Sequence, residues 1–262
     1  MINGVLNVYK EKGYTSHDVV AKLRGILKQK KIGHTGTLDP DAQGVLPVCL
    51  GRATKLCGML TDKRKTYEAV IHLGIETDTQ DISGQVKCQR PVEVSPEKVA
   101  ECIRSFEGEQ MQVPPMYSAL KVQGKKLYEL AREGKEVERK PRPVTFYDIK
   151  ILSMELPFVT VRVTCSKGTY IRTLCHDIGE KLGCKGCMES LLRTRVDRFS
   201  IENSLKLSQI EELVNQGELE KYILGPDEMF SDYPKILADR KFDKMLENGN
   251  PRHSRMVLGG IS

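Results

Sequence analysis

The sequence predicts an α+β protein, with a mixed, largely antiparallel sheet and helices packed on it. Two segments, 66–73 and 158–165, alternate apolar and polar residues as half-buried strands do. Other segments carry apolar residues at helical spacing, and strand signals outnumber clean strand–helix–strand repeats. With 262 residues, 39% of them hydrophobic, the chain is long enough for one large core or for a large and a small domain.

Two helices are expected in the first half of the chain. The first has Thr15 or Ser16 as its N-cap and Gly33 just past its end, and its apolar residues are Val19, Val20, Leu23, Ile26 and Leu27. Ser95 and Pro96 open the second, with proline at the first helical position, and its inward residues are Val99, Cys102, Ile103 and Phe106.

Two more helices and the two strands complete the regular elements. Residues 125–133 suggest a third helix that Gly134 ends, and Ser208 with Glu211 forms a capping box for a fourth that Gly217 closes. The strand residues expected to share one face are Tyr67, Ala69, Ile71 and Leu73 in the first strand and Val159, Val161, Val163 and Cys165 in the second.

Two long segments are expected to be irregular. Residues 33–47 hold three glycines and two prolines, which predicts an ordered loop rather than a helix or a central strand. Residues 107–142 contain several prolines and a basic stretch, and they are predicted to form an insertion that can move.

Asp39, in the first of these segments, is a candidate for chemistry. It precedes Pro40, which favours an extended backbone, and a carboxylate on such a loop can project into a cleft. The pattern alone favours the plainer alternative, an aspartate that caps its own turn.

Arg172 is a candidate partner for a carboxylate. Residues 165–173 follow a predicted strand, and Tyr170 and Arg172 share a face if the chain there is extended. An arginine that faces a carboxylate makes a bidentate, charge-assisted pair and keeps the carboxylate ionised. The alternative is an arginine in solvent, which is the commoner outcome for any one arginine.

Positive charge is concentrated in two parts of a chain whose net charge is +6. Residues 1–65 carry a net +7 and residues 121–142 a net +4, whereas residues 201–262 carry a net −3. Tyr117 and Tyr128 lie in or beside the second segment, so it has the composition of an arm that contacts RNA. Interleaved glutamates make a solvated helix face an equal alternative.

The eight cysteines are expected to be reduced and mostly buried, as in a cytoplasmic protein. Cys184 and Cys187 form a lone C-x-x-C, which is weak support for zinc, and the histidines lack the spacing of a zinc deaminase. The chain has no run of about 18 apolar residues and its N-terminus lacks the pattern of a secretion signal, so neither a membrane span nor export is expected.

Several sequence blocks occur in the order of one known family across residues 2–200. They are Gly33-His34-Thr35-Gly36-Thr37-Leu38-Asp39-Pro40, Gly51-Arg52-Ala53-Thr54-Lys55, Lys65-x-Tyr67, Thr77-Asp78-Thr79-x-Asp81, Pro114-Pro115-x-Tyr117-Ser118-Ala119-Leu120-Lys121, Gly168-Thr169-Tyr170-Ile171-Arg172 and Leu192-Arg193. In this combination the chain resembles the TruB family of tRNA pseudouridine-55 synthases.

The resemblance implies the pseudouridine synthase fold and the isomerisation of uridine to pseudouridine at position 55, in the T-loop of tRNA. The N1–C1′ bond breaks, the base turns and C5 bonds to C1′, after the base has left its stack. The resemblance implies no cofactor and no metal ion, and it makes the T-arm of tRNA the partner. We expect a cytoplasmic monomer that needs no obligatory protein partner.

The resemblance also assigns roles to single residues. Asp39 would be the nucleophile, at C6 or C1′ or by assisting deprotonation at C2′, and Arg172 would pair with it. Tyr67 would stack on the target base and help to remove the C5 proton. The implied substrate-binding residues are His34, which supports the rearranged RNA loop, Tyr170, which lies beside the base, Leu192, which lines the apolar side of the pocket, and Lys10.

The expected organisation is a catalytic domain over residues 1–222, with an insertion at about 107–142 that clamps the T-stem, and a short segment over 223–262. Asp232-Tyr233-Pro234 and Asn248-Gly249-Asn250-Pro251 resemble the family's approach to a small RNA-binding PUA domain, which this segment would form only in part. The family's N-terminal Lys-Pro motif lacks its proline here, because Glu11 follows Lys10.

Two other functions stay open at this point. A catalytically inert RNA chaperone on the same scaffold could dispense with Asp39, Tyr67 and Arg172, yet all three are present. A guide-RNA-dependent pseudouridine synthase subunit would rely on a complete C-terminal domain to hold its guide.

Overall fold

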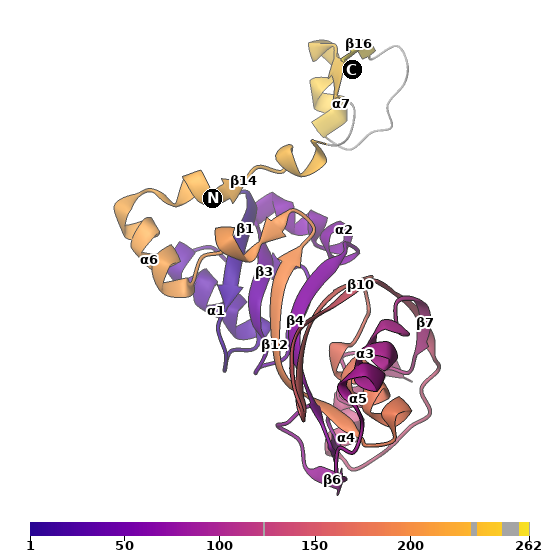
Figure 1. The fold of residues 1–262 in the computed structure, drawn as a ribbon. Coiled ribbons are helices and arrows are strands. Elements are labelled where there is room, and N and C mark those ends of the chain that lie inside the picture. The colour runs from indigo at the N-terminus through magenta and orange to yellow at the C-terminus, as the bar shows by residue number, and fades with distance from the viewer. Residues whose placement is uncertain (123, 232–234, 248–256, 262) are drawn as a thin grey trace.

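One large curved sheet runs through the molecule (Figure 1), and the computed structural model describes residues 1–122, 124–231, 235–247 and 257–261. The strands in spatial order are β14 (Ile223–Leu224), β1 (Gly4–Lys10), β3 (Gln43–Leu50), β12 (Gly186–Val196), β4 (Lys65–Leu73), β11 (Phe158–Cys165), β10 (Arg142–Glu155) and β7 (Gly108–Gln112). Two short strands lie outside this order: β2 (Ile32–His34) pairs with β3, and β13 (Phe199–Ser200) pairs with β12. These pairings are antiparallel except for a short parallel contact between β12 and β3, which confirms the predicted fold class.

The remaining elements of the described residues are helices and short hairpins. The α-helices are α1 (Ser16–Leu27), α2 (Cys57–Thr61), α3 (Pro96–Arg104), α4 (Leu127–Arg132), α5 (Ile171–Leu182), α6 (Leu207–Gln216) and α7 (Asp243–Glu247). The 3₁₀ segments are η1 (Gly51–Leu56), η2 (Ile201–Asn203), η3 (Leu219–Tyr222), η4 (Glu228–Phe230) and η5 (Arg240–Phe242). Two-stranded sheets pair β5 (Ile75–Thr77) with β6 (Val86–Gln89), β8 (Lys121–Val122) with β9 (Lys125–Lys126), and β15 (Lys235–Ala238) with β16 (Val257–Ile261).

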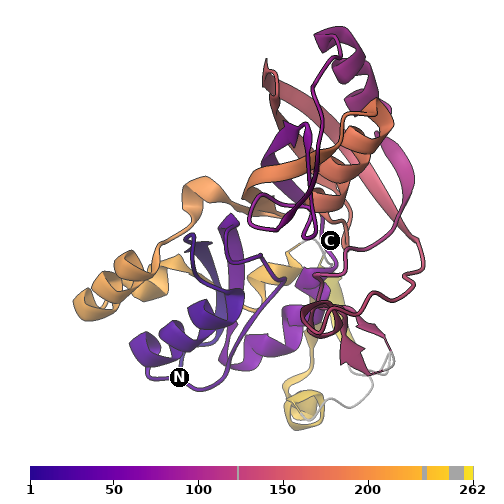
Figure 2. The same cartoon turned by 90° about the horizontal axis from the view of Figure 1, so that it is seen from below.

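Helices cover the two halves of the sheet in different ways. In the half that contains β1 and β3, α1 and α6 pack on one face, while η1 and α2 pack on the other. In the half that contains β4, β11 and β10, the apolar face is covered by α3 and α5. Figure 2 shows these two groups of helices at opposite ends of the sheet. The short β12–β3 contact joins the two halves.

The two strands predicted from alternation are confirmed. β4 and β11 pair side by side in antiparallel register, with Tyr67 opposite Val163. Every residue expected on the common face is buried, because that face meets α3 and α5. The opposite face of β4 is only partly buried, as alternation requires.

The prediction that residues 33–47 contain no central strand is wrong for their last part. β3 begins at Gln43 and lies inside the large sheet, so the loop proper is 35–42. Pro47 has no backbone NH to donate, but its position in β3 requires none. Its partner across the strands is Asn7, whose carbonyl points away from β3 and accepts a hydrogen bond from the NH of Leu205. Pro47 and Asn7 therefore form a pair without ladder hydrogen bonds.

Helix ends differ from the sequence expectations in three places. The helix expected over 125–133 is α4, which begins only at Leu127, because residues 125 and 126 form β9. Thr15 caps α1 and forms a capping box with Asp18, but the helix ends at Lys28 in the left-handed region, and Gly33 lies in β2. Ser208 is not an N-cap, because α6 begins at Leu207 with Lys206 as its N-cap, two residues earlier than a cap at Ser208 requires. The expected caps at Ser95 and Gly217 are present.

The segment 107–142 is more regular than predicted. Residues 108–112 form β7, the edge strand that pairs with β10, so the irregular part begins after Gln112. All eight cysteines are free thiols, and six of them are buried, which confirms the prediction for them. None of the helices in the described ranges has the length and apolar character needed to cross a membrane. The motifs at 232–234 and 248–251 lie outside the described residues.

Candidate active site

Asp39 lies on the loop 35–42, which connects β2 to β3 and is tied to its surroundings on both sides. The backbone NH of Leu38 donates to Ser16 Oγ at the start of α1, at 2.9 Å. The NH of Ala42 donates to the Asp39 carbonyl at 3.1 Å and closes a tight turn. The Asp39 side chain keeps 39% of its surface exposed, so the fixed loop presents a carboxylate to solvent.

Arg172 makes a two-pronged contact with this carboxylate. Its Nε lies 3.0 Å from Asp39 Oδ2, and its Nη2 donates to Oδ1 at 3.2 Å. The two residues are 133 positions apart in the chain, and the pair is the one that the resemblance implies. Since the planar guanidinium matches both carboxylate oxygens, it sets the orientation of Asp39 as well as its charge.

The guanidinium of Arg172 is itself held from three other directions, and its side chain is only 6% exposed. Nη1 donates to the Thr79 carbonyl at 3.0 Å and lies 3.6 Å from Asp81 Oδ2, while Nη2 also donates to the Tyr117 carbonyl at 2.8 Å. Asp81 falls in one of the blocks that carry the resemblance, but nothing in its local sequence indicates a role for it. The structure makes it part of the support of Arg172.

The ionisation of Asp39 depends on two opposing effects. Removal from water raises the pKa of its carboxyl group, and the Arg172 guanidinium lowers it. To a smaller extent, Asp81 also raises the pKa of Asp39 and Lys10 also lowers it. Burial outweighs the guanidinium, so the pKa of the Asp39 carboxyl group lies above its ordinary value, and the contact with Arg172 limits this rise. That contact favours the carboxylate, the form that can act as a nucleophile or base.

Two tyrosines flank the pair. Tyr67 on β4 is 7% exposed, and burial raises the pKa of its hydroxyl. Tyr170 is the N-cap of α5, and Gln112 fixes its backbone by two hydrogen bonds, one to its carbonyl and one from its NH. The expectation of an extended chain that puts Tyr170 and Arg172 on one face is wrong, because a helix begins between them at Ile171.

Leu192, expected on the apolar side of the pocket, lies on the face of β12 opposite to that of Leu191. Leu192 pairs with Glu68 across β12 and β4, and directly paired residues share a face, so it lies on the side of the sheet opposite Tyr67. Leu191 pairs with Ala69 and belongs to the apolar cluster that includes Tyr67 and Leu38. The leucine beside the tyrosine is therefore Leu191.

Lys10, expected to bind the substrate, is the last residue of β1. It is fully buried, and its Nζ donates to the carbonyls of Pro40 at 3.0 Å and Ala42 at 2.5 Å. Burial lowers the pKa of its ammonium group to about 8, against an opposing effect of Asp39. Lys10 therefore fixes the end of loop 35–42 through these hydrogen bonds.

His34 is at the end of β2, directly before the loop. Its Nδ1 accepts a hydrogen bond from the Gly36 backbone NH at 3.3 Å. Burial and the nearby Arg193 lower the pKa of its ring, so the imidazole is neutral at neutral pH. A neutral, partly exposed ring suits stacking better than ion pairing.

The basic segment 121–142 combines paired and unpaired cations. Glu133 accepts ion pairs from Lys125 and Lys135, at 3.7 and 2.8 Å. Arg132 instead lies over the ring of Tyr128, 5.4 Å from its centre. Among the described residues, ion pairs are absent at four exposed cations of the segment, namely Lys121, Arg132, Lys140 and Arg142.

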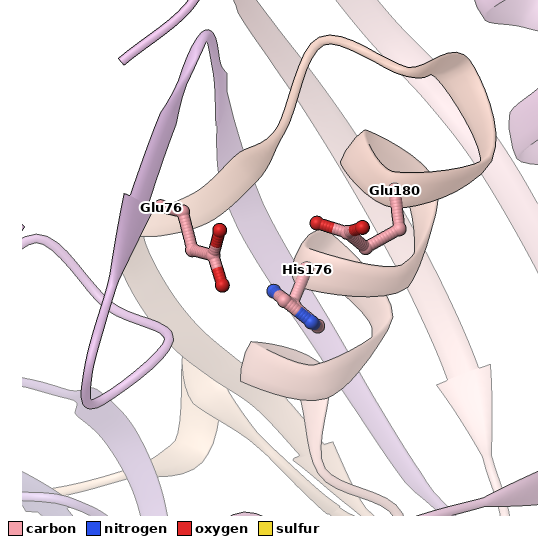
Figure 3. Close-up of side chains that lie close together, drawn as sticks. All are labelled: Glu76, His176 and Glu180. Carbon is pink, nitrogen blue, oxygen red and sulfur yellow. The ribbon is translucent and has the colours of Figure 1, made fainter. Parts of the chain in front are cut away.

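A second cluster of titratable groups lies between β5 and α5. Glu76, His176 and Glu180 bring ligand atoms within 4.8 Å of one another, and Figure 3 shows the side chains converging from the two elements. The Lys185 ammonium lies 2.9 Å from Glu76 and 2.6 Å from Glu180, which gives both carboxylates a cation already. We interpret the cluster as an ion-pair network that fastens β5 to α5.

Two family models match the sequence. The model of the TruB family pseudouridylate synthase N-terminal domain matches residues 24–171, and the model of the tRNA pseudouridylate synthase B C-terminal domain matches residues 172–231. The tRNA pseudouridine synthase B of Lachnoclostridium phytofermentans is 57% identical over 95% of this chain and 84% of its own length. That of Alkaliphilus oremlandii is 48% identical over 99% of this chain and 86% of its own.

Solved structures give the same result for the fold. The structure of a Cbf5–Nop10–Gar1 complex contains a chain that matches with a TM-score of 0.76 and 31% identity, over 97% of this chain and 69% of that one. A box H/ACA ribonucleoprotein bound to a substrate RNA containing 2′-deoxyuridine matches with a TM-score of 0.74 and 29% identity, over the same shares of the two chains.

Proposed function

Because this chain belongs to the TruB family of pseudouridylate synthases and is a tRNA-modifying isomerase, we propose that it acts on the uridine at position 55, in the T-loop of tRNA. The observation that carries the proposal is the half-exposed Asp39 carboxylate, clamped by Arg172 and flanked by Tyr67 and Tyr170. An ionised carboxylate beside aromatic rings suits attack on a base that has left its stack.

Asp39 is the group that starts the reaction. It attacks C6 of the base or C1′ of the ribose, or it assists deprotonation at C2′, and the N1–C1′ bond then breaks. The base turns and C5 bonds to C1′. Any bond that Asp39 has formed breaks, or C2′ regains the proton it lost, so that Asp39 is restored. The proton on C5 leaves with the help of Tyr67 while N1 gains a proton. Leu191 offers the turning base an apolar wall.

The RNA is held outside this pocket by stacking and by charge. His34 supports the T-loop after the target base has left it, by stacking its neutral ring. The part of the insertion that follows Gln112 clamps the T-stem with its exposed cations. In this proposal residues 1–222 are the catalytic domain, and the protein works in the cytoplasm as a monomer, without a cofactor, a metal ion or an obligatory protein partner.

The test is to map pseudouridine by nucleotide in an unmodified tRNA transcript incubated with the purified protein alone. We expect one site, position 55, and no product in a transcript with cytidine there. Product at another position would overturn the T-loop assignment. Turnover that needs an added guide RNA or protein would favour the guide-dependent alternative, and release of no C5 tritium from labelled tRNA would favour an inert chaperone.

Replacing three of the unpaired cations, Lys121, Arg132 and Lys140, by glutamine should weaken tRNA binding and flatten its salt dependence. Each lost phosphate contact removes about 0.7 to 0.9 from the slope of log affinity against log salt, so three should remove about 2 to 3. Binding titrations at several salt concentrations measure the slope. The control replaces Lys125 and Lys135, which Glu133 already pairs, and should change it little. An unchanged slope in the triple variant would assign the segment to a solvated helix face.

A further inference from the structure

Arg193 is an almost fully buried cation that none of the roles above uses. It lies on β12, where its side chain is 1% exposed, and it is among the largest fully buried side chains. Within the described residues no carboxylate forms an ion pair with it, unlike Arg172. A buried charge without a counter-charge is costly, so its hydrogen bonds must compensate for the lost water.

Those hydrogen bonds go to the backbone on both sides of Asp39. Nη2 donates to the Gly36 carbonyl at 3.2 Å, and Nη1 lies at 3.5 Å from that of Thr37. Nε donates to the Val45 carbonyl at 2.7 Å, beyond the other end of the loop. One planar guanidinium therefore spans the loop 35–42 from its beginning to the first residues of β3.

The backbone of Arg193 is pressed against the same segment. Arg193 pairs with Gly44 in the parallel contact between β12 and β3. A Cβ atom built on Gly44 would lie 2.2 Å from the Arg193 carbonyl oxygen, and Gly44 has a φ of +106°. Only glycine permits this approach, which brings the guanidinium within reach of the loop.

The other neighbour of Arg193 is Tyr67. The two residues are directly paired across β12 and β4, so their side chains share a face. The positive charge of Arg193 lowers the pKa of the Tyr67 hydroxyl, against the upward effect of burial. The same side chain thus holds the loop that carries Asp39 and shares a face with the tyrosine on the neighbouring strand.

We propose that Arg193 is a positioning residue that fixes the loop of Asp39 relative to Tyr67, so that the carboxylate and the phenol meet the target uridine in one geometry. This inference rests on the catalytic roles proposed above for Asp39 and Tyr67. Arg193 itself is shielded from the RNA by its burial and acts through these two residues. Lys10 holds the end of the loop from another side, and its ammonium group donates to the carbonyls of Glu11, Pro40 and Ala42.

The experiment compares Arg193→Lys and Arg193→Met with the control Arg195→Met, an exposed arginine two residues along the same strand. Single-turnover rate constants are measured with enzyme in saturating excess over tRNA, and dissociation constants are measured separately. We expect both Arg193 variants to lose about 10- to 100-fold in rate, as small misplacements of reacting groups do. Their dissociation constants should stay within about twofold of wild type, since no phosphate contact is lost.

Rescue by a small cation separates positioning from general stability. Arg193→Ala leaves a space shaped for guanidinium, and about 10 mM guanidinium, far below denaturing concentrations, should restore part of its rate. The same addition should leave Asp39→Asn inactive. Thermal unfolding midpoints with and without guanidinium show whether the restored rate merely follows restored folding.

Three results would overturn the inference: rates within twofold of wild type in both variants, parallel loss of rate, binding and thermal midpoint without rescue, or failure of both variants to fold. The proposed function is judged separately, by whether wild-type protein modifies position 55. The ratio of the Arg193 variant's rate to the wild-type rate measures the effect of Arg193 on the reaction even if the modified uridine lies at another position.

Discussion

Asp39→Asn should reduce the single-turnover rate by at least about 10³-fold, the scale on which loss of a nucleophile acts. The amide keeps the size of the carboxyl group but loses its charge and nucleophilicity. Arg172 should stay in place, because Asp81 and the carbonyls of Thr79 and Tyr117 still hold it. The pocket and the affinity for tRNA should therefore survive, and rate and binding measured side by side test this.

The matched control is Asp41→Asn, two residues farther along the same loop, where the side chain is exposed. It removes the same charge from the same loop and should keep most of the activity. Substantial turnover by Asp39→Asn would falsify the assignment of Asp39 as nucleophile. Equal losses in both variants would point instead to the charge of the loop as a whole.

Arg172→Lys should lower the rate by about 10²-fold, because a lysine cannot hold both oxygens of Asp39 in one plane. It also leaves at least one of the partly buried carbonyls of Thr79 and Tyr117 without its donor. We expect the free energy of unfolding to fall by about 1 to 3 kcal/mol for that reason. Single-turnover kinetics and urea unfolding measure the two effects.

Arg162→Lys is the control for this substitution. Arg162 donates from Nε and Nη2 to Glu68 at 3.1 and 2.7 Å, but the pair is exposed on the outer side of the sheet. An exposed ion pair contributes little, so stability and rate should both stay close to wild type. A near-wild-type rate in Arg172→Lys would mean that the bidentate contact does not set the orientation of Asp39 in the reaction.

Much of the local structure was predictable because it depends on local chemistry. β4 and β11 alternate apolar and polar residues, and Ser95 with Pro96 opens α3 as the sequence indicates. The boundaries of loop 35–42 were less predictable. Pro47 by itself disfavours a central strand, because it has no backbone NH. It is compatible with β3 only because its pairing with Asn7 requires no hydrogen bond from it.

The candidate site, too, could be predicted only in part from the sequence. Asp39 and Arg172 could be named from sequence blocks, but composition alone favoured a turn aspartate and a solvent-exposed arginine. Their contact joins residues 133 positions apart, and no spacing rule reports such a pair. Asp81 joins them for the same reason, from a third segment of the chain.

The sequence by itself determined which residue types are available: a carboxylate on a glycine-rich loop, the aromatic rings, and an excess of cations. Only the tertiary structure decided which side of the sheet each residue faces. The register of β12 against β4 shifts between Met188 and Ser190, and this shift decides that Leu191, rather than Leu192, lies beside Tyr67. A one-residue change of register exchanges the two faces of a strand, so the pairing of distant strands, and not the local sequence, determines what lines the pocket.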